Sequence, residues 1–400
     1  MSLPAYLSAG VDPLPLFVYV LSLAVFAQGT SEFMLAGLVP GIARDLSVSV
    51  GAAASLTSAY AVGMIAGAPV MAAVSARWPR RRALAGFLAA FVVVHVIGAV
   101  TASFPVLFGT RIVAAIVNAG FLAVAMSVAT ALTPPAKHAR ATATLLAGVT
   151  LSCVAGVPAG AALGDWSGWR SAFWAVAVLC LPALALVFRS APAAAARHHD
   201  VSIRQEAGEL RSGPVRLALT LAALVNGATF ATFAYLAVIA TDVTQLPGGA
   251  IPGLLAAFGV GAFIGVTTAG RIGDGRLGRG LVITLCVLPA GWAVLAATST
   301  HPVPLFIVTV IQGGLSFGIG SMLVHRVMFV ASRAPSLSGS FATVALNAGA
   351  FLGPLLAGIA TETTHDYRHA AWVSAALAAT AAVVLVASRT RAAHAESNTG

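Results

Sequence analysis

The stretch Trp169-Arg170-Ser171-Ala172-Phe173-Trp174 is followed, 198 residues later, by Tyr367-Arg368-His369-Ala370-Ala371-Trp372. At the same offset and without gaps, Gly51, Gly63 and Gly67 fall on Gly249, Gly261 and Gly265. Glycine matches alone would be common by chance in a chain with 40 Gly. An aromatic–Arg pair with a Trp four residues after the Arg recurs by chance far more rarely than a glycine does. The chain is therefore predicted to be a duplication, with two halves built on one plan.

Both halves are strongly apolar. Of the 400 residues, 59% are hydrophobic and only 8% are charged, whereas soluble proteins carry about 25% charged residues. A helix that crosses a bilayer needs about 20 apolar residues. Such stretches fall near residues 15–38, 50–75, 83–102, 106–132, 141–164, 171–188, 215–240, 250–270, 280–299, 303–328, 338–361 and 370–388. The expected fold is an all-α membrane protein with twelve transmembrane helices in two six-helix pseudo-repeats, which excludes a soluble enzyme.

The basic residues predict how these helices are oriented. With both termini in the cytoplasm, eighteen of the 22 Lys and Arg lie in inner loops and three in outer loops, and Arg111 lies within a span. This bias is the positive-inside pattern. It explains the net charge of +10 by membrane topology, so no nucleic-acid partner is expected. The expected location is the cell (inner) membrane, and the expected state is a monomer.

The predicted domains follow from the same pattern. An N-terminal bundle covers residues 1–189, a cytoplasmic linker 190–213, a C-terminal bundle 214–389 and a cytoplasmic tail 390–400. The linker is expected to hold a short amphipathic helix on the membrane surface around 201–210.

Ionisable side chains inside a span are the first candidates for function, because each costs about 2.5–3.5 kcal/mol at mid-span. Among the twelve Asp and Glu, only Glu32 lies well inside a span, and Arg111 is the corresponding base. We interpret Glu32 as a proton carrier and Arg111 as the group that tunes its affinity for the proton. A static ion pair that fixes helix packing is the alternative. His95, in the third span, could titrate, but a hydrogen-bonded packing role is favoured.

The sequence does not indicate ATP as a direct energy source. A nucleotide-binding Gly-x-x-x-x-Gly-Lys-Ser/Thr loop does not occur, and Lys137 is the only lysine. The three cysteines, Cys153, Cys180 and Cys286, are not spaced as metal ligands. We therefore expect no metal and no cofactor, with energy drawn from a proton gradient.

The first span resembles a known signature. Gly29-Thr-Ser-Glu-Phe-Met-Leu-Ala-Gly-Leu-Val-Pro-Gly-Ile-Ala-Arg-Asp-Leu46 is similar to the first helix of twelve-span drug:proton antiporters of the major facilitator superfamily. The stretches 57–64, 67–73, 118–125 and 156–160 look like those of actinomycete chloramphenicol-resistance exporters. The resemblance covers nearly the whole chain. It implies the major facilitator fold and proton-driven efflux of chloramphenicol by alternating access, which confers antibiotic resistance. Efflux of another small metabolite or sugar is the alternative, and a membrane sensor that transports nothing is a more distant one.

The family also suggests which residues govern the conformational change. Its Asp-Arg-x-Gly-Arg-Arg loop resembles the loops at 76–82 and 274–279, although Ala76 replaces the acid in the first loop. The candidates there are Arg77, Arg80, Arg81, Asp274 and Arg279. A basic cluster that only sets topology is the alternative for the first loop. In the fifth span, Gly156, Pro158 and Gly160 resemble the Gly-Pro-rich antiporter motif, and they permit a kinked helix with close backbone approach.

By analogy with the fold, spans 1, 4, 7 and 10 line the substrate cavity. The polar and aromatic candidates for contact with a small-molecule drug are Gln28, Asn118, Asn226, Phe230, Phe233, Tyr235 and Gln312. Aromatic walls with a few uncharged donors suit a neutral or weakly polar amphiphile. Ordinary packing is the alternative for each of these residues.

Overall fold

The computed structural model describes residues 14–75, 78–134, 137–190, 208–271, 274–332 and 338–397. Within these ranges the secondary structure is helical and contains no strand. Twelve of the described helical segments are long and apolar enough to cross a membrane. The predicted all-α fold is confirmed, and the chain is a multi-pass membrane protein. The expected linker helix falls largely in 191–207, outside the described residues.

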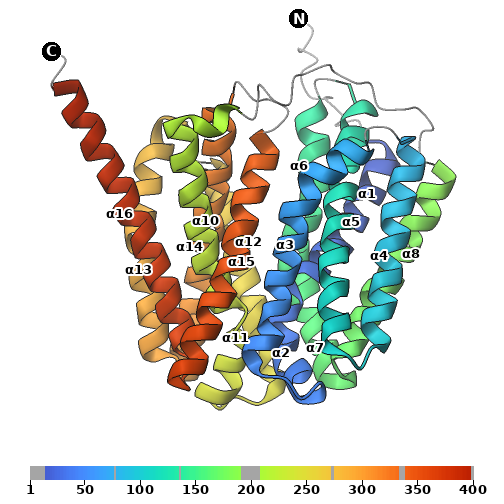
Figure 1. Cartoon of the computed structure of the whole chain (residues 1–400), viewed down its shortest axis with the longest axis horizontal. Helices are drawn as coiled ribbons and strands as arrows, with labels where there is room; N and C mark the ends of the chain where they lie inside the picture. The colour runs from blue at the N-terminus through green and yellow to red at the C-terminus, as the bar shows by residue number, and fades with distance from the viewer. Residues whose placement is uncertain are drawn as a thin grey trace, which may run out of the picture.

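The elements follow the predicted order in both halves (Figure 1). The N-terminal half comprises α1 (Leu16–Phe33), α2 (Leu35–Asp45), α3 (Val50–Ser75), α4 (Arg80–Val100), α5 (Phe104–Ala131), α6 (His138–Leu151), the π-helical turn η2 (Ser152–Gly156), α7 (Val157–Ser167) and α8 (Trp169–Ser190). The C-terminal half comprises η3 (Gly208–Arg211), α10 (Gly213–Phe233), α11 (Leu236–Val238), η4 (Ile239–Val243), η5 (Gly248–Ala250), α12 (Ile251–Arg271), α13 (Asp274–Thr298), α14 (Pro302–Val330), α15 (Ser338–Thr364) and α16 (His369–Ser397).

The first and seventh spans are both interrupted near their middle, at related positions. The N–H of Gly37 donates to the carbonyl of Met34 (3.1 Å), and 198 residues later the N–H of Tyr235 donates to Thr232 (3.0 Å). These bonds reach back three residues instead of the four of an α-helix, so each helix tightens for one turn. The apolar stretches predicted continuous helices here. Because the interruption occurs at related positions in both halves, it belongs to the duplicated plan.

Glycines bring two helix pairs into backbone contact, again at related positions. A methyl group on Gly63 would overlap the carbonyl oxygen of Ile112, and one on Gly261 would overlap that of Val310. Gly265 faces the carbonyl oxygen of Gly314 in the same way. The pairs α3–α5 and α12–α14 therefore pack without intervening side chains, as small residues allow in membrane helices.

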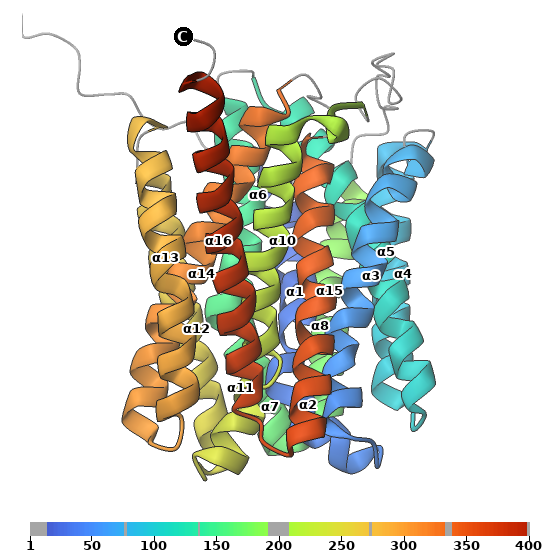
Figure 2. The same ribbon diagram turned by 60° about the vertical axis from the view of Figure 1, so that its left-hand side comes forward.

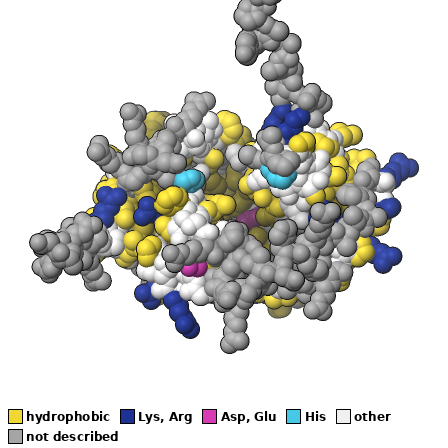
Figure 3. Space-filling model, turned by 90° about the horizontal axis from the view of Figure 1, so that it is seen from above, with side chains coloured by type: hydrophobic (Ala, Val, Ile, Leu, Met, Phe, Trp, Pro, Cys, Tyr) yellow, Lys and Arg dark blue, Asp and Glu magenta, His cyan; other side chains and the backbone are white. Residues whose placement is uncertain are grey.

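The start of α1 and the end of α16 lie on one side of the molecule, here called the terminal side (Figures 1 and 2). On the opposite, far side the two halves touch. The hydroxyl of Ser49 donates to Oε1 of Glu362 (2.8 Å), and Gly51 also packs against Glu362. On the terminal side, a hollow with apolar walls lies between the halves, with an acidic side chain in its depth (Figure 3). The structure is therefore closed on the far side and open on the terminal side.

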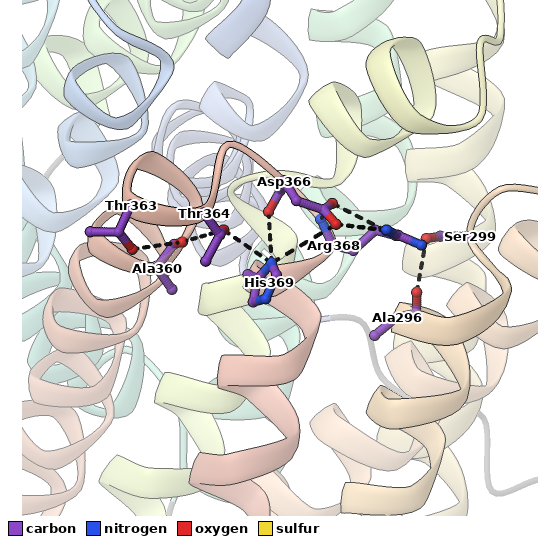
Figure 4. A network of polar contacts seen from close by, with 8 residues as sticks. All are labelled: Ala296, Ser299, Ala360, Thr363, Thr364, Asp366, Arg368 and His369. Atoms are coloured by element: carbon purple, nitrogen blue, oxygen red, sulfur yellow. Dashed lines mark hydrogen bonds and ion pairs between the residues drawn. The ribbon is translucent and has the colours of Figure 1, made fainter.

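The repeated aromatic–Arg motif lies on the far side and forms a clamp in each half. In the N-terminal clamp, Arg170 pairs with Asp45 and donates to the carbonyl of Thr101 (3.0 Å), and the indole N–H of Trp169 also reaches Asp45 (3.0 Å). In the C-terminal clamp, Arg368 pairs with Asp366, two residues away (2.8 Å; Figure 4). These hydrogen bonds hold the pKa of each aspartate below its ordinary value of 3.8.

Candidate functional site

Arg111 is the centre of the candidate proton site. Its side chain, on α5, is only 1% exposed. Nη1 donates to the hydroxyl of Ser31 (2.8 Å) and Nη2 to the Ser31 carbonyl (2.7 Å). The guanidinium lies 4.6 Å from the ring centre of Tyr60, at cation–π distance. A buried charge is costly without such partners, so these neutral groups hold the cation in place.

A hydrogen-bonded chain continues from Ser31 to His95 on α4. The Ser31 hydroxyl lies 2.6 Å from Nε2 of His95, and Nδ1 lies 2.7 Å from the Phe91 carbonyl. A carbonyl only accepts and a guanidinium only donates. Nδ1 must therefore carry the hydrogen, and the Ser31 proton is left to donate to Nε2. The chain is satisfied with a neutral His95, in agreement with the predicted hydrogen-bonded role.

Glu32 follows Ser31 on α1 and points in another direction, since neighbouring helical residues are about 100° apart. The side chain is half-buried. Glu32 and Arg111 attract each other electrostatically. No ion pair joins their side chains, both of which belong to the described part of the chain. This carboxyl group can accordingly change its protonation without breaking a direct bond to the arginine.

Asn118, predicted as a substrate contact, belongs to the same cluster. Its amide donates to the Tyr60 hydroxyl (2.8 Å) and approaches the sulfur of Met64 (3.7 Å). Asn118 thus orients the ring on which Arg111 rests. We call Ser31, Tyr60, His95, Arg111 and Asn118 the arginine cluster.

Phe230 and Phe233, two further predicted contacts, belong to a row of five phenyl rings. Successive ring centres are 5.9, 5.9, 4.8 and 5.9 Å apart. In order, this aromatic row contains Phe33, Phe230, Phe233, Phe258 and Phe317. Phe33 ends α1, so the row begins on the helix that carries Glu32 and crosses into the C-terminal half.

The remaining predicted contacts pack more locally. The Asn226 amide donates to Leu346 on α15 (2.6 Å), and the Gln312 amide donates to Leu288 on α13 (3.2 Å). Tyr235 is fully buried at the interruption between α10 and α11. Gln28 is 1% exposed, and its amide has no partner among the described residues. The structure does not bring these four residues together.

The predicted conformational residues of the fifth span pack on α1. A methyl group on Gly156 would overlap Thr30, and one on Gly160 would lie 3.1 Å from Cβ of Met34. Pro158 lies in the first turn of α7, directly after η2. Proline lacks the N–H that an α-helix needs, which explains why the helix widens before it.

The loop candidates are only partly described. Arg81 donates to the carbonyl of Phe188 at the end of α8. Nε of Arg80 is buried and has no partner among the described residues. Arg77 and the side chains of Asp274 and Arg279 lie outside the described part of the chain.

Sequence reasoning missed Ser31 and Tyr60. Both are neutral, and neutral polar residues are common in membrane helices, so the cost of burial does not single them out. The available signal was the unbroken polar run Thr30-Ser31-Glu32 within an apolar span. Within the described ranges, no three His, Cys, Asp or Glu residues gather as metal ligands.

Comparison with known proteins identifies the family of this chain. The family model of the Major Facilitator Superfamily matches residues 21–345. A chloramphenicol resistance protein of Streptomyces lividans is 49% identical over 380 residues, 94% of this chain and 97% of that protein. A chloramphenicol efflux pump of Mycobacterium tuberculosis is 29% identical over 357 residues, 86% of this chain and 85% of that protein.

Solved structures support the same fold. A bacterial homologue of the human lysosomal transporter Spinster, in an inward-facing and unoccupied conformation, superimposes with a TM-score of 0.76. The match covers 94% of this chain and 96% of that one at 17% identity. The chain belongs to the Major Facilitator Superfamily and is a transporter of small molecules, not an enzyme. The predicted resemblance to chloramphenicol-resistance exporters is confirmed.

Proposed function

We propose that this transporter exports chloramphenicol from the cytoplasm in exchange for protons, by alternating access. The observation that carries the proton coupling is a half-buried Glu32 that lies beside the buried Arg111 without pairing to it. The 49% identity to the Streptomyces protein supports the drug as substrate.

The terminal side faces the cytoplasm in this proposal, and the bilayer is the cell membrane. The excess of Lys and Arg in the loops on that side supports this orientation. The hollow that opens on the terminal side is then the entrance for a drug that arrives from within the cell.

The transport cycle uses Glu32 as its switch. With Glu32 ionised and the hollow open to the cytoplasm, the drug binds between the halves. The far-side contact of Ser49 with Glu362 then separates as the molecule opens outward. A proton from outside neutralises Glu32, the drug leaves, and the neutral carboxyl group favours the return. Open to the cytoplasm again, Glu32 releases that proton to the cytoplasm, which restores the ionised starting state.

The aromatic row supports binding of the aromatic ring of the drug. Phenyl faces and edges stack with another ring for about 0.5–1.5 kcal/mol per pair beyond simple burial. Phe33 and Glu32 both lie on α1, so a ring held against Phe33 would contact the helix that carries the group that changes charge.

One proton is sufficient for useful export. At a membrane potential of about 100 mV an inward-moving charge supplies about 2.3 kcal/mol. At 1.4 kcal/mol per factor of ten, that energy holds a neutral drug about 50-fold from equilibrium.

Glu32→Gln tests the proton carrier. In everted vesicles with an imposed pH gradient, we expect the variant to lose the whole drug gradient while drug-for-drug exchange continues, since exchange needs no net proton movement. Glu209→Gln makes the same chemical change in η3, away from the arginine cluster, and is the control. Proton-coupled accumulation by Glu32→Gln at the wild-type level would refute the assignment.

The substrate is tested separately. Expression in a host that lacks its own drug exporters should raise tolerance to chloramphenicol. If tolerance is unchanged while another metabolite or a sugar drives proton movement in vesicles, the substrate is that molecule and the coupling mechanism stands.

A further inference from the structure

On the far side, two carboxylates reach from one half to the other. Where α15 meets α3, Oε1 of Glu362 accepts a hydrogen bond from the Ser49 hydroxyl (2.8 Å), and a methyl group on Gly51 would overlap the same oxygen. Where α7 meets α12, a methyl group on Gly248 would lie 2.9 Å from Oδ1 of Asp165. Each acid comes from one half and lies against the first residues of a helical segment in the other half.

The two contacts are related by the duplication. At the offset of 198 residues, Gly51 corresponds to Gly249 and Asp165 to Thr363. These positions are one residue away from the glycine and the acid that form the other contact. The hydrogen bond from Ser49 is not repeated, because a proline stands at the corresponding position. What both contacts share is a carboxylate packed closely on a glycine at the start of a helical segment.

The surroundings of the two carboxylates differ. Ser49 ties Glu362 to the start of α3, because its hydroxyl oxygen also accepts from the N–H of Ala52 (3.1 Å). Beside Asp165, a cavity of about 80 Å³ lies between the halves and has room for water. A carboxylate near the first turn of a helix is stabilised by the partial positive charge there, and water screens this attraction. The contact of Asp165 is therefore expected to be the weaker of the two.

We propose that Glu362 and Asp165 are paired latches, which keep the far side closed while the hollow is open on the terminal side. Both contacts join opposite halves, so both must separate when the far side opens. Their loss shifts the balance between the two conformations and leaves the packing within each half unchanged. The proposal rests on alternating access in the proposed function, but it involves neither chloramphenicol nor Glu32. A different substrate or proton carrier would leave it standing.

Opening is measured by labelling a cysteine that the closed far side buries. Leu255 on α12 is 1% exposed and lies against Gly37 of the other half. Leu255→Cys is introduced into the full-length chain together with Cys153→Ser and Cys286→Ser, and the protein is placed in nanodiscs without drug. A maleimide reaches the introduced cysteine only when the far side opens, so the labelling rate follows the population of that conformation. Cys180, fully buried within the N-terminal half, is kept to report unfolding.

Glu362→Ala should raise the labelling rate about fivefold, Asp165→Ala about twofold and the double variant about tenfold. Gly51→Ala should raise it about twofold, because the added methyl group displaces the Glu362 carboxylate, although alanine itself favours the helix. Asp242→Ala is the matched control and should be labelled as fast as the background chain. Asp242 is also an exposed acid on the far side, but it accepts from its neighbour Thr241 within one half (2.7 Å).

Equal labelling of the double variant and the Asp242→Ala control would overturn the proposal. So would a parallel rise in the labelling of Cys180, because it would show that the variants loosen the fold instead of opening the far side. Both results would leave the proposed function standing. If the cysteine of Leu255→Cys is never labelled in any variant, the far side does not open, and the latches and alternating access are both refuted.

Discussion

The two halves share a backbone plan but differ in chemistry at the depth of Glu32. At the offset of 198 residues, Glu32 corresponds to Phe230, Tyr60 to Phe258 and Arg111 to Thr309. Arg111 and Thr309 are each 1% exposed, so the two positions are equally buried. Only the N-terminal one carries a charge.

This difference separates two tasks. The N-terminal half holds Glu32 and Arg111, which the proposed proton coupling uses, and the C-terminal half holds most of the aromatic row. The contact of Phe33 on α1 with Phe230 on α10 joins the two halves across the pseudo-symmetry axis. Coupling between drug and proton is accordingly expected where these two rings meet.

The largest expected effect comes from exchanging the buried cation for an apolar residue in one half only. Arg111→Leu leaves the Ser31 acceptors unpaired and Glu32 without a nearby cation, so we expect a loss of about 3 kcal/mol in stability and no uphill efflux. Thr309→Val is the related change in the other half. The Thr309 hydroxyl has no partner among the described residues, so we expect a change within about 0.5 kcal/mol. Unfolding in detergent measures both, and equal losses would contradict the asymmetry.

A smaller effect is expected from the residue that positions Arg111. Ser31→Ala removes the hydroxyl that joins Arg111 to His95, and a hydrogen bond to a charged group contributes about 1.5–3 kcal/mol. Uphill efflux should fall about tenfold or more, while drug-for-drug exchange is retained. Ser31→Thr should restore coupling, and Thr229→Ala, the related change in the other half, should have little effect. If the wild type and Ser31→Thr couple drug to protons no better than Ser31→Ala does, Ser31 only fills space.

The smallest effect is expected at the two far-side clamps. Since the pKa of both aspartates is lowered in the folded state, their stabilisation is fully present above about pH 3.8 and is lost as the pH falls through the lowered values. Both pairs are partly exposed, so each contributes no more than about 1 kcal/mol. Asp45→Asn should lower the melting temperature at pH 6 more than Asp366→Asn, because Asp45 joins distant segments. The difference should vanish near pH 2, and a constant difference would exclude the aspartate charge as its cause.

The sequence allows prediction of those features of the fold and of the candidate site that depend on the free energy of inserting side chains into the bilayer. The twelve spans and the choice of Glu32 and Arg111 as candidates follow from the cost of placing polar groups in lipid, and the duplication follows from the motif that recurs after 198 residues. The interruptions at Met34 and Thr232 were not predicted, because apolar periodicity does not distinguish a kinked helix from a straight one.

The partners of the site residues depend on how each helix is rotated, which hydropathy does not determine. Asn118, which is predicted to contact substrate, donates to Tyr60, and hydropathy could not have indicated this partner. Gln312, also predicted to contact substrate, donates its amide to the Leu288 carbonyl on α13. Ser31 was missed because nothing in its own chemistry distinguishes it from Thr30.

The backbone contacts of Gly63, Gly261 and Gly265 limit how this transporter can evolve. Any larger residue at these positions would force two helices apart, so mutations that widen or narrow the range of exported compounds must be accepted elsewhere. Smaller side chains in place of the phenylalanines of the aromatic row would leave these backbone contacts intact, because the rings are not part of them. Laboratory selection for resistance to new compounds should therefore enrich substitutions in those rings and leave the three glycines untouched.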